Sequence, residues 1–130
     1  MSKLDPQNIK RFKNIAIVGA SNNPEKYGYR ATQNLIDAGY TVFPVNPHED
    51  TILGQRVFHN LTEIEGEINL VVFVTKPSFV LETLQTVLDK DIRNVWFQPG
   101  SESEEAINFC EANNIAHIEK ACIIIDRLDG

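Results

Sequence analysis

The chain has 130 residues, of which 42% are hydrophobic and 23% charged, and its formal net charge is −6. This length suits one domain with its own core, whereas nucleic-acid binding would need clustered cations that so acidic a chain does not offer. Residues 1–13 lack the apolar segment of a signal peptide, and no apolar run approaches the roughly 20 residues that span a bilayer. We expect a single cytoplasmic domain over 1–130, with 1–13 a polar N-terminal lead-in, and neither nucleic acid nor membrane as a partner.

Short apolar runs alternate with longer amphipathic segments along the chain. Residues 14–19 are predicted to form a buried strand that ends at a glycine. The segment 29–38 has helical spacing and also stops at a glycine, a helix C-terminal signal. Residues 41–45 predict a second strand. The following stretch, 48–60, indicates a loop, with room for a short strand at 56–58.

The middle of the chain carries the clearest strand, 70–74, which is almost continuously apolar. Such a run is typical of a central strand covered on both faces. A proline at a helix start and a stripe of apolar residues then predict a helix over 77–88. Residues 94–98 predict the fourth strand, which a Pro-Gly pair ends.

The last third of the chain predicts one more helix and one more strand. Ser101 or Ser103 can cap a helix that runs through Asn113. Residues 115–118 predict a short fifth strand. The apolar tail at 123–128 has no predicted position.

These strand–helix repeats predict the fold class. They favour an α/β protein, a single Rossmann-like doubly wound domain of about five parallel strands with helices on both faces. Counting the predicted strands along the chain, we expect the order 3-2-1-4-5.

Ligands of such sheets bind beyond the carboxyl ends of the strands. Gly19 lets the chain turn after the first strand, and the next helix offers unpaired N–H groups to an anion. Ser21 and Asn22 add short polar side chains, while Lys26 and Arg30 add positive charge. The alternative is a solvated loop in which the glycine serves only the turn.

The same loop departs from the known dinucleotide and nucleotide motifs. Ser21 stands where the second glycine of G-x-G-x-x-G would approach a pyrophosphate, and residues 44–47 lack the acidic ribose ligand. Lys26 lacks the flanking residues of a Walker A motif. The sequence therefore disfavours NAD.

Several segments occur together in a recognisable order: 17–21, 26–30, 40–47, 53–54 and 95–100. Their order and spacing resemble the stand-alone CoA-binding domain family, which is related to the N-terminal CoA-binding domain of the succinyl-CoA synthetase alpha subunit. The resemblance covers about 15–122. It implies coenzyme A, or an acyl-CoA, as the small-molecule nucleotide ligand.

The resemblance also implies where the parts of the ligand lie. Residues 19–22 would contact the diphosphate and 46–48 would lie near the adenosine, while 75–77 and 98–100 would complete the cleft wall. Lys120–Cys122 is similar to a family segment that often reads Asp-Arg-Cys. The predicted ligand-binding residues are Gly19, Ala20, Ser21, Asn22, Lys26, Arg30, Asn46, Pro47, His48, Thr75, Lys76, Pro77, Gln98, Gly100 and Cys122.

The sequence departs from its relatives just after the second strand. Where relatives often place a lysine, this chain has His48-Glu49-Asp50. Two carboxylates would repel the ribose phosphate of CoA. Lys76 or Arg56 is an alternative partner for that phosphate.

The remaining candidates are histidines and cysteines. His59 and His117 have no obvious acidic or nucleophilic partner nearby and are expected to be surface or half-buried residues. Cys110 is expected to be a small core residue. For Cys122, a buried residue and a reactive thiol facing the cleft are both open.

No set of nucleophile, base and orienting residue is evident, and no metal-ligand spacing occurs. The synthetase relatives work with a separate phosphohistidine-bearing domain, and we expect none in this chain. The sequence thus favours a CoA-binding module over an enzyme. A small acyl-CoA transferase or thioester enzyme using Cys122 or His48, and a nucleotide-sensing module, are the alternatives; a protein partner or a homodimer stays open.

Overall fold

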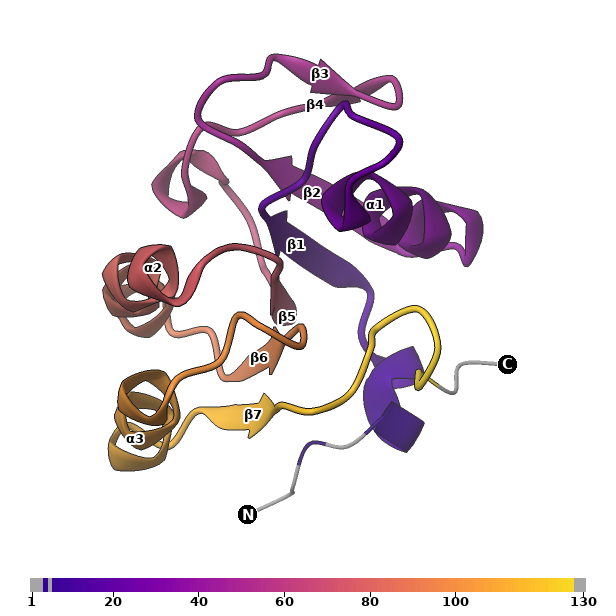
Figure 1. Ribbon diagram of the computed structural model, residues 1–130. Helices are drawn as coiled ribbons and strands as arrows, with labels where there is room; N and C mark the ends of the chain where they lie inside the picture. Colours follow the sequence, from indigo (N-terminus) through magenta and orange to yellow (C-terminus); the bar gives the residue numbers. More distant parts are fainter. Residues whose placement is uncertain (1–3, 5, 128–130) are drawn as a thin grey trace.

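A five-stranded parallel sheet forms the centre of the computed structural model, which describes Leu4 and residues 6–127 (Figure 1). In space the strands follow the order β2-β1-β5-β6-β7. Their bounds are β1 Asn14–Val18, β2 Thr41–Val45, β5 Leu70–Phe73, β6 Asn94–Phe97 and β7 Ala116–Ile118. All four residues of β5 are buried, so the prediction of a central strand covered on both faces is confirmed.

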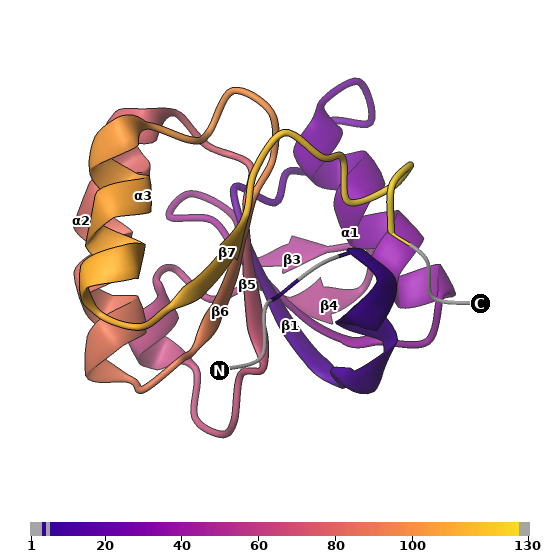
Figure 2. The same ribbon diagram turned by 90° about the horizontal axis from the view of Figure 1, so that it is seen from below.

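Helices cover both faces of the sheet. Figure 2 shows α1 (Tyr27–Asp37) on one side and α2 (Pro77–Asp89) with α3 (Glu104–Ala112) on the other. This arrangement confirms the predicted α/β class with helices on both faces. Over the described residues, none of the helices has the length and apolar character needed to cross a membrane.

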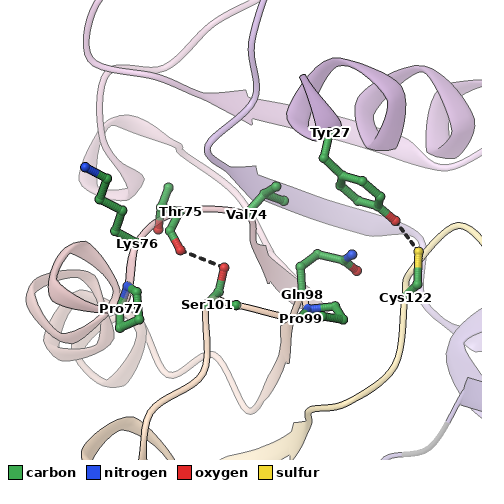
Figure 3. A pocket seen from close by; sticks show the side chains of 10 residues that line it. Tyr27, Val74, Thr75, Lys76, Pro77, Gln98, Pro99, Ser101 and Cys122 are labelled. Atoms are coloured by element: carbon green, nitrogen blue, oxygen red, sulfur yellow. Dashed lines mark hydrogen bonds between the residues drawn. The ribbon is translucent and has the colours of Figure 1, made fainter. Parts of the chain in front are cut away.

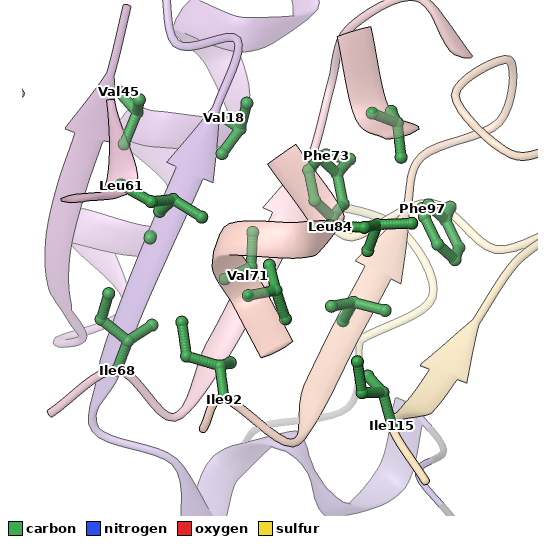
Figure 4. Packing of buried hydrophobic residues seen from close by; sticks show 14 of the residues in the cluster. Val18, Val45, Leu61, Ile68, Val71, Phe73, Leu84, Ile92, Phe97 and Ile115 are labelled. Atoms are coloured by element: carbon green, nitrogen blue, oxygen red, sulfur yellow. The ribbon is translucent and has the colours of Figure 1, made fainter. Parts of the chain in front are cut away.

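The two faces of the sheet carry separate hydrophobic clusters. Under α2 and α3, alternate strand residues such as Val71 and Phe73 pack against Leu84 and its neighbours on α2 (Figure 4). Cys110 of α3 is fully buried in this cluster, as predicted. The alternate residues of the same strands face α1, where Trp96 is fully buried. Successive residues along each strand thus point to opposite faces of the sheet and pack under different helices, as expected for a sheet covered on both faces.

The predicted strand order, 3-2-1-4-5, is wrong. The third predicted strand, β5, pairs with β1 and not with β2, so the order in chain sequence is 2-1-3-4-5. The connection from β2 to β5 explains the difference, because it holds no covering α-helix. It contains the hairpin of β3 (Thr51–Ile52) and β4 (Gln55–Arg56) and the short 3-10 helix η2 (Leu61–Glu63), and so carries the chain past β1. The short strand expected at 56–58 is largely replaced by this hairpin and by one bridge between Val45 and Phe58.

Helix starts agree with the predictions to within two residues. The second helix begins at Pro77, as predicted, and the first begins at Tyr27, two residues before the predicted 29. Ser103 caps α3, its hydroxyl accepting the Ala106 N–H at 3.0 Å. Ser101 is not the cap; it is buried and donates its hydroxyl to the Thr75 carbonyl at 2.7 Å.

The ends of the chain complete the cluster beneath α1. The polar lead-in forms a 3-10 helix, η1 (Pro6–Arg11), and both Leu4 and Ile9 are buried. Near the other end, Ile123 is buried and its N–H donates to Gln98 Oε1 at 2.6 Å. Both segments lie against the face that α1 covers only in part (Figure 2). Residues 1–3, 5 and 128–130 lie outside the described residues.

Candidate functional site

The turn after β1 is built on two glycines in close contact. Gly19 has a φ of +105°, and a Cβ added to it would lie 2.6 Å from the Val74 carbonyl oxygen. A Cβ on Gly28, in the first turn of α1, would lie only 2.0 Å from the Gly19 carbonyl oxygen. The helix therefore approaches the turn at backbone distance, the same function that the third glycine has in dinucleotide-binding loops. The sequence analysis assigned no role to Gly28.

The strand order places this turn at the switch point of the sheet. With the order 2-1-3-4-5, the chain reverses its direction of winding between β1 and β5, where open α/β sheets bind ligands. The carboxyl ends of these strands meet there. The Val74 N–H donates to the Val18 carbonyl at 2.8 Å, and Thr75 follows beside Gly19.

Two pockets open on either side of Thr75. The first, of about 550 Å³, lies between the start of α1 and the loops after β5 and β6 (Figure 3). It gathers six of the predicted residues: Thr75, Lys76, Pro77, Gln98, Gly100 and Cys122. Tyr27 and Ser101 line it as well, and the sequence analysis missed both as site residues.

The second pocket, of about 420 Å³, lies between the β1 turn, the loop after β2 and the exposed side of α2. It gathers five predicted residues: Gly19, Asn46, Pro47, His48 and Thr75. Its other lining residues include Phe79 and Glu82 on α2 and His59 and Leu61 on the β2–β5 connection. The sequence analysis treated this part of α2 only as a helix, although Phe79 is 52% exposed and an exposed aromatic is a recognisable signal.

Five of the predicted site residues line neither of these pockets: Ala20, Ser21, Asn22, Lys26 and Arg30. Ala20 is fully buried. Ser21 Oγ accepts the Asn23 N–H at 3.0 Å, and Asn22 Nδ2 donates to the Thr51 carbonyl at 2.7 Å, so both side chains shape the loop. Arg30 lies over the Tyr27 ring, on the side of α1 where a third pocket opens.

Asn46 ties the loops after β1 and β2 together. Its Nδ2 donates to the Ala20 carbonyl at 2.7 Å, and its Oδ1 accepts the His48 N–H at 2.7 Å. The amide therefore holds the wall of the second pocket in place, because both of its polar atoms have protein partners.

Among the described residues, α1 and α2, two of the three α-helices, begin next to the candidate site and have N-termini that could bind an anion. Lys26 and Lys76 are the N-cap residues of α1 and α2, and neither helix has a side-chain capping bond or an acidic first turn among the described residues. The third helix, α3, has the Ser103 cap and the acidic Glu104 in its first turn. Uncapped N–H groups and a positive helix end favour a bound phosphate.

The expectation that two histidines lack acidic partners is wrong. His59 Nε2 lies 3.2 Å from Asp50 Oδ1, and His117 lies between Glu119, at 2.6 Å, and Glu111, at 3.4 Å. Glu119 is only two residues from His117 and was overlooked, whereas Asp50 and Glu111 reach the histidines from other segments of the fold. The contact between His59 and Asp50 bears on the predicted repulsion between Asp50 and a phosphate. When His59 is protonated, its positive charge offsets the negative charge of the Asp50 carboxylate.

Arg56, one of the two alternative partners for the ribose phosphate, does not line the second pocket. Its guanidinium lies over the Phe58 ring, 4.7 Å from the centroid. Lys76 lines the first pocket. The described lining of the second pocket therefore offers His48 and His59 as its basic side chains.

Cys122 lies in the first pocket against the hydroxyl of Tyr27 (Figure 3). Burial raises the pKa of the Cys122 thiol, but hydrogen bonds from Tyr27, from backbone N–H groups and from Gln98 outweigh it, so the pKa is lowered overall. Burial raises the pKa of Tyr27, and the contact with Cys122 raises it further. Residues 95 positions apart meet here, so no local pattern could have found the pair.

The chain belongs to the CoA-binding domain family, whose model matches residues 13–127. The expected resemblance is therefore confirmed. Within the described residues, we find no group of His, Cys, Asp or Glu side chains arranged to hold a metal ion.

Relatives of two sizes match this chain. It is 31% identical over 115 residues to the Bacillus subtilis protein YneT, covering 88% of this chain and 85% of YneT. It is 37% identical over 84 residues to the alpha subunit of an ADP-forming acetate–CoA ligase of Pyrococcus furiosus, covering 64% of this chain but only 18% of that subunit. Among solved structures, a conserved hypothetical protein of Pyrococcus furiosus superimposes with a TM-score of 0.84 at 36% identity, covering 88% of this chain and 98% of that one.

Proposed function

We propose that this protein is a module that binds coenzyme A or an acyl-CoA at the carboxyl edge of its sheet. The observation that carries the proposal is the pair of pockets that meet at Thr75, at the switch point of a chain belonging to the CoA-binding domain family. One pocket suits the nucleotide end of the ligand and the other suits its pantetheine arm.

The diphosphate is assigned to the junction between the pockets. There Gly19 and Gly28 carry no side chains that could stand between a ligand and the backbone of the turn, and α1 and α2 begin without side-chain caps. Lys76 stands at the start of α2 and lines the first pocket, so its ammonium group supplies a cation at this junction.

The adenosine is assigned to the second pocket. Val45 and Leu61 contribute an apolar surface, and the exposed ring of Phe79 offers a face on which a base can stack. Glu82 lies on the same side of α2, where its carboxylate can accept the exocyclic amino group of adenine. His48 stands in the loop where the ribose phosphate would lie.

The pantetheine arm is assigned to the first pocket. Its two amide groups need donors and acceptors. The Gln98 side-chain amide can donate, and the Ser101 hydroxyl oxygen, whose hydrogen goes to the Thr75 carbonyl, can accept. The thiol end then points toward Cys122 and Tyr27.

Partners and location follow as further parts of the proposal. The chain spans 18% of the ligase subunit that it resembles, so any ligase-type activity would need a protein partner that supplies the rest. We propose a single cytoplasmic binding domain as the working unit.

Calorimetric titration of CoA into the full chain tests the phosphate assignment through Lys76→Glu. Reversing this charge beside a phosphate should weaken CoA binding by about 1.5–3 kcal/mol, roughly 10- to 100-fold. Lys10→Glu is the matched control, because it changes the net charge equally on an exposed residue of η1, before the amino end of β1. It should change affinity less than about 2-fold at physiological salt. Equal losses in both variants would contradict the assignment of Lys76 to the phosphate.

A further inference from the structure

Three side chains from distant parts of the sequence converge on one wall of the first pocket (Figure 3). Tyr27 comes from the first turn of α1, Gln98 follows β6, and Cys122 follows β7. The Tyr27 hydroxyl contacts Cys122 Sγ, and Gln98, only 4% exposed, is fixed by the bond from the Ile123 N–H to its Oε1. The cysteine is therefore one member of a built cluster that faces a cavity.

The pKa values of the two contacting groups shift in opposite directions. Burial and the neighbouring thiol raise the pKa of Tyr27, so it stays a phenol whose hydrogen is available to a Cys122 thiolate. Backbone N–H groups of Ile125 and Ile124 and the Gln98 side chain also lower the pKa of Cys122. The thiolate, the form that attacks disulfides, is thus favoured at this position.

A second observation in the same pocket points to a ligand. The Thr75 hydroxyl is enclosed and makes no hydrogen bond to any of the described residues. It belongs to the loop that separates the two pockets and lines both of them. An enclosed polar group without a partner calls for an explanation, and a ligand that reaches the Thr75 loop would supply the missing hydrogen bond.

The other cysteine, Cys110, lies in surroundings that keep its thiol protonated and inaccessible. Cys110 is fully buried in the cluster under α2 and α3. Burial raises the pKa of its thiol to about 12, with the carboxylates of Glu119 and Glu111 adding to the effect. The protein therefore carries an internal control for thiol reactivity.

We propose that Cys122 is a ligand-directed redox thiol, which forms a mixed disulfide with the thiol end of CoA bound in the first pocket. The proposal rests on the proposed function. The co-reactant is the symmetrical disulfide of CoA. The Cys122 thiolate attacks one sulfur of that disulfide, a new S–S bond forms to one CoA as the old S–S bond breaks, and the second CoA leaves as a thiolate that takes a proton from water. One disulfide is consumed and one is formed, so no further oxidant is needed.

Titratable and charged groups from several elements lie near Cys122. Tyr27 and Arg30 approach it from α1, and Lys76 lines the first pocket but points away from Cys122 (Figure 3). Asp37 lines the third pocket with it, and Asp126 accepts the Cys122 N–H at 2.6 Å. A pH profile therefore needs a variant that changes one of these groups alone.

The first test compares two disulfides on the intact chain by mass spectrometry. CoA disulfide should add the mass of one CoA less two hydrogens at Cys122, and it should do so at least 10-fold faster than 2-hydroxyethyl disulfide at equal concentration. Cys122→Ser should abolish the adduct, and Cys110 should stay unmodified. Modification of Cys110 in the folded chain, or equal rates with both disulfides, would overturn the proposal.

The second test measures how the Tyr27 hydroxyl affects the pH dependence of the Cys122 reaction. It uses Tyr27→Phe, which removes the hydroxyl and keeps the ring. With 2-hydroxyethyl disulfide, whose reaction needs no CoA site, the pH of half-maximal rate should shift upward in this variant. An unshifted profile in a variant that melts like the parent would contradict the role given to the hydroxyl.

Titration of CoA into Cys122→Ser separates this proposal from the proposed function. If the serine variant binds CoA and the parent forms no mixed disulfide, the redox proposal fails while CoA binding stands. If neither protein binds CoA, the proposed function fails. A reaction of Cys122 with CoA disulfide would then not depend on a bound CoA, so the redox proposal would fail as well.

Discussion

At the scale of single residues, Gly28 leaves no room for a side chain. A Cβ there would meet the Gly19 carbonyl oxygen at 2.0 Å, so Gly28→Ala must push α1 away from the β1 turn. Overpacking of this kind destabilises by about 1–3 kcal/mol or more. Urea unfolding should show that loss, and CoA affinity should fall with it because the turn moves.

Gly39→Ala is the matched control for that experiment. A Cβ at Gly39 meets nothing within 4 Å, but the φ of +97° strains an alanine by roughly 1–2 kcal/mol. Its stability should fall while CoA affinity stays that of the parent. A Gly28→Ala protein as stable as the parent would contradict the close approach of α1 to the turn.

Because the Cys110 thiol is buried, we expect the free energy of unfolding to fall at alkaline pH. The pKa of this thiol rises from 9.0 in the unfolded chain to about 12 in the folded protein, so the folded state keeps the proton that the unfolded state releases. This contribution is fully present below about pH 9 and is lost as the pH rises toward 12, with a slope of at most about 1.4 kcal/mol per unit. Urea unfolding from about pH 8 to about pH 10.5 should show a shallower decline for Cys110→Ala than for the parent, although the variant is less stable throughout. Parallel declines would contradict the buried thiol's role.

At the scale of elements, the loop after β2 is where the proposed function places the ribose phosphate of CoA. His48 lines the pocket, and its imidazole carries a charge only when it is protonated. His48→Lys should therefore strengthen CoA binding at about pH 8 by a few-fold, within about 1 kcal/mol for an exposed pair. Dephospho-CoA is the control, since it lacks the ribose phosphate and should bind both proteins alike in calorimetry. Equal gains for both ligands would place that phosphate elsewhere.

The elements themselves were largely predictable, and their order was not. The continuous apolar run of β5 correctly predicts a central strand, because only a strand covered on both faces buries every side chain. The predicted strand order was wrong at the β2–β5 connection. There the sequence periodicity indicates a loop, but it does not indicate on which side of β1 the next strand lies. Gly19 could be assigned to the candidate site from the fold, and Thr75 from the family resemblance. The contact between Tyr27 and Cys122 could not, because tertiary packing alone brings these residues together.

At the scale of the whole molecule, the sheet order decides where the site lies. Because β5 returns beside β1, the β1 turn and the Thr75 loop share one edge, and the two pockets form around them. The N-terminal and C-terminal segments cover the rest of the α1 face, and the tail brings Cys122 to the first pocket. Cys122, which directly precedes the tail that had no predicted position, thus contributes to a wall of the candidate site.

The stability of the full chain in CoA and in NAD tests the central claim most directly. A ligand at about 100 times its dissociation constant adds roughly 2.7 kcal/mol to the free energy of unfolding. CoA should raise the thermal midpoint accordingly. NAD should leave it unmoved, because the chain lacks the second glycine and the acidic ribose ligand of a dinucleotide site. A midpoint raised by millimolar NAD and unmoved by CoA would contradict the account.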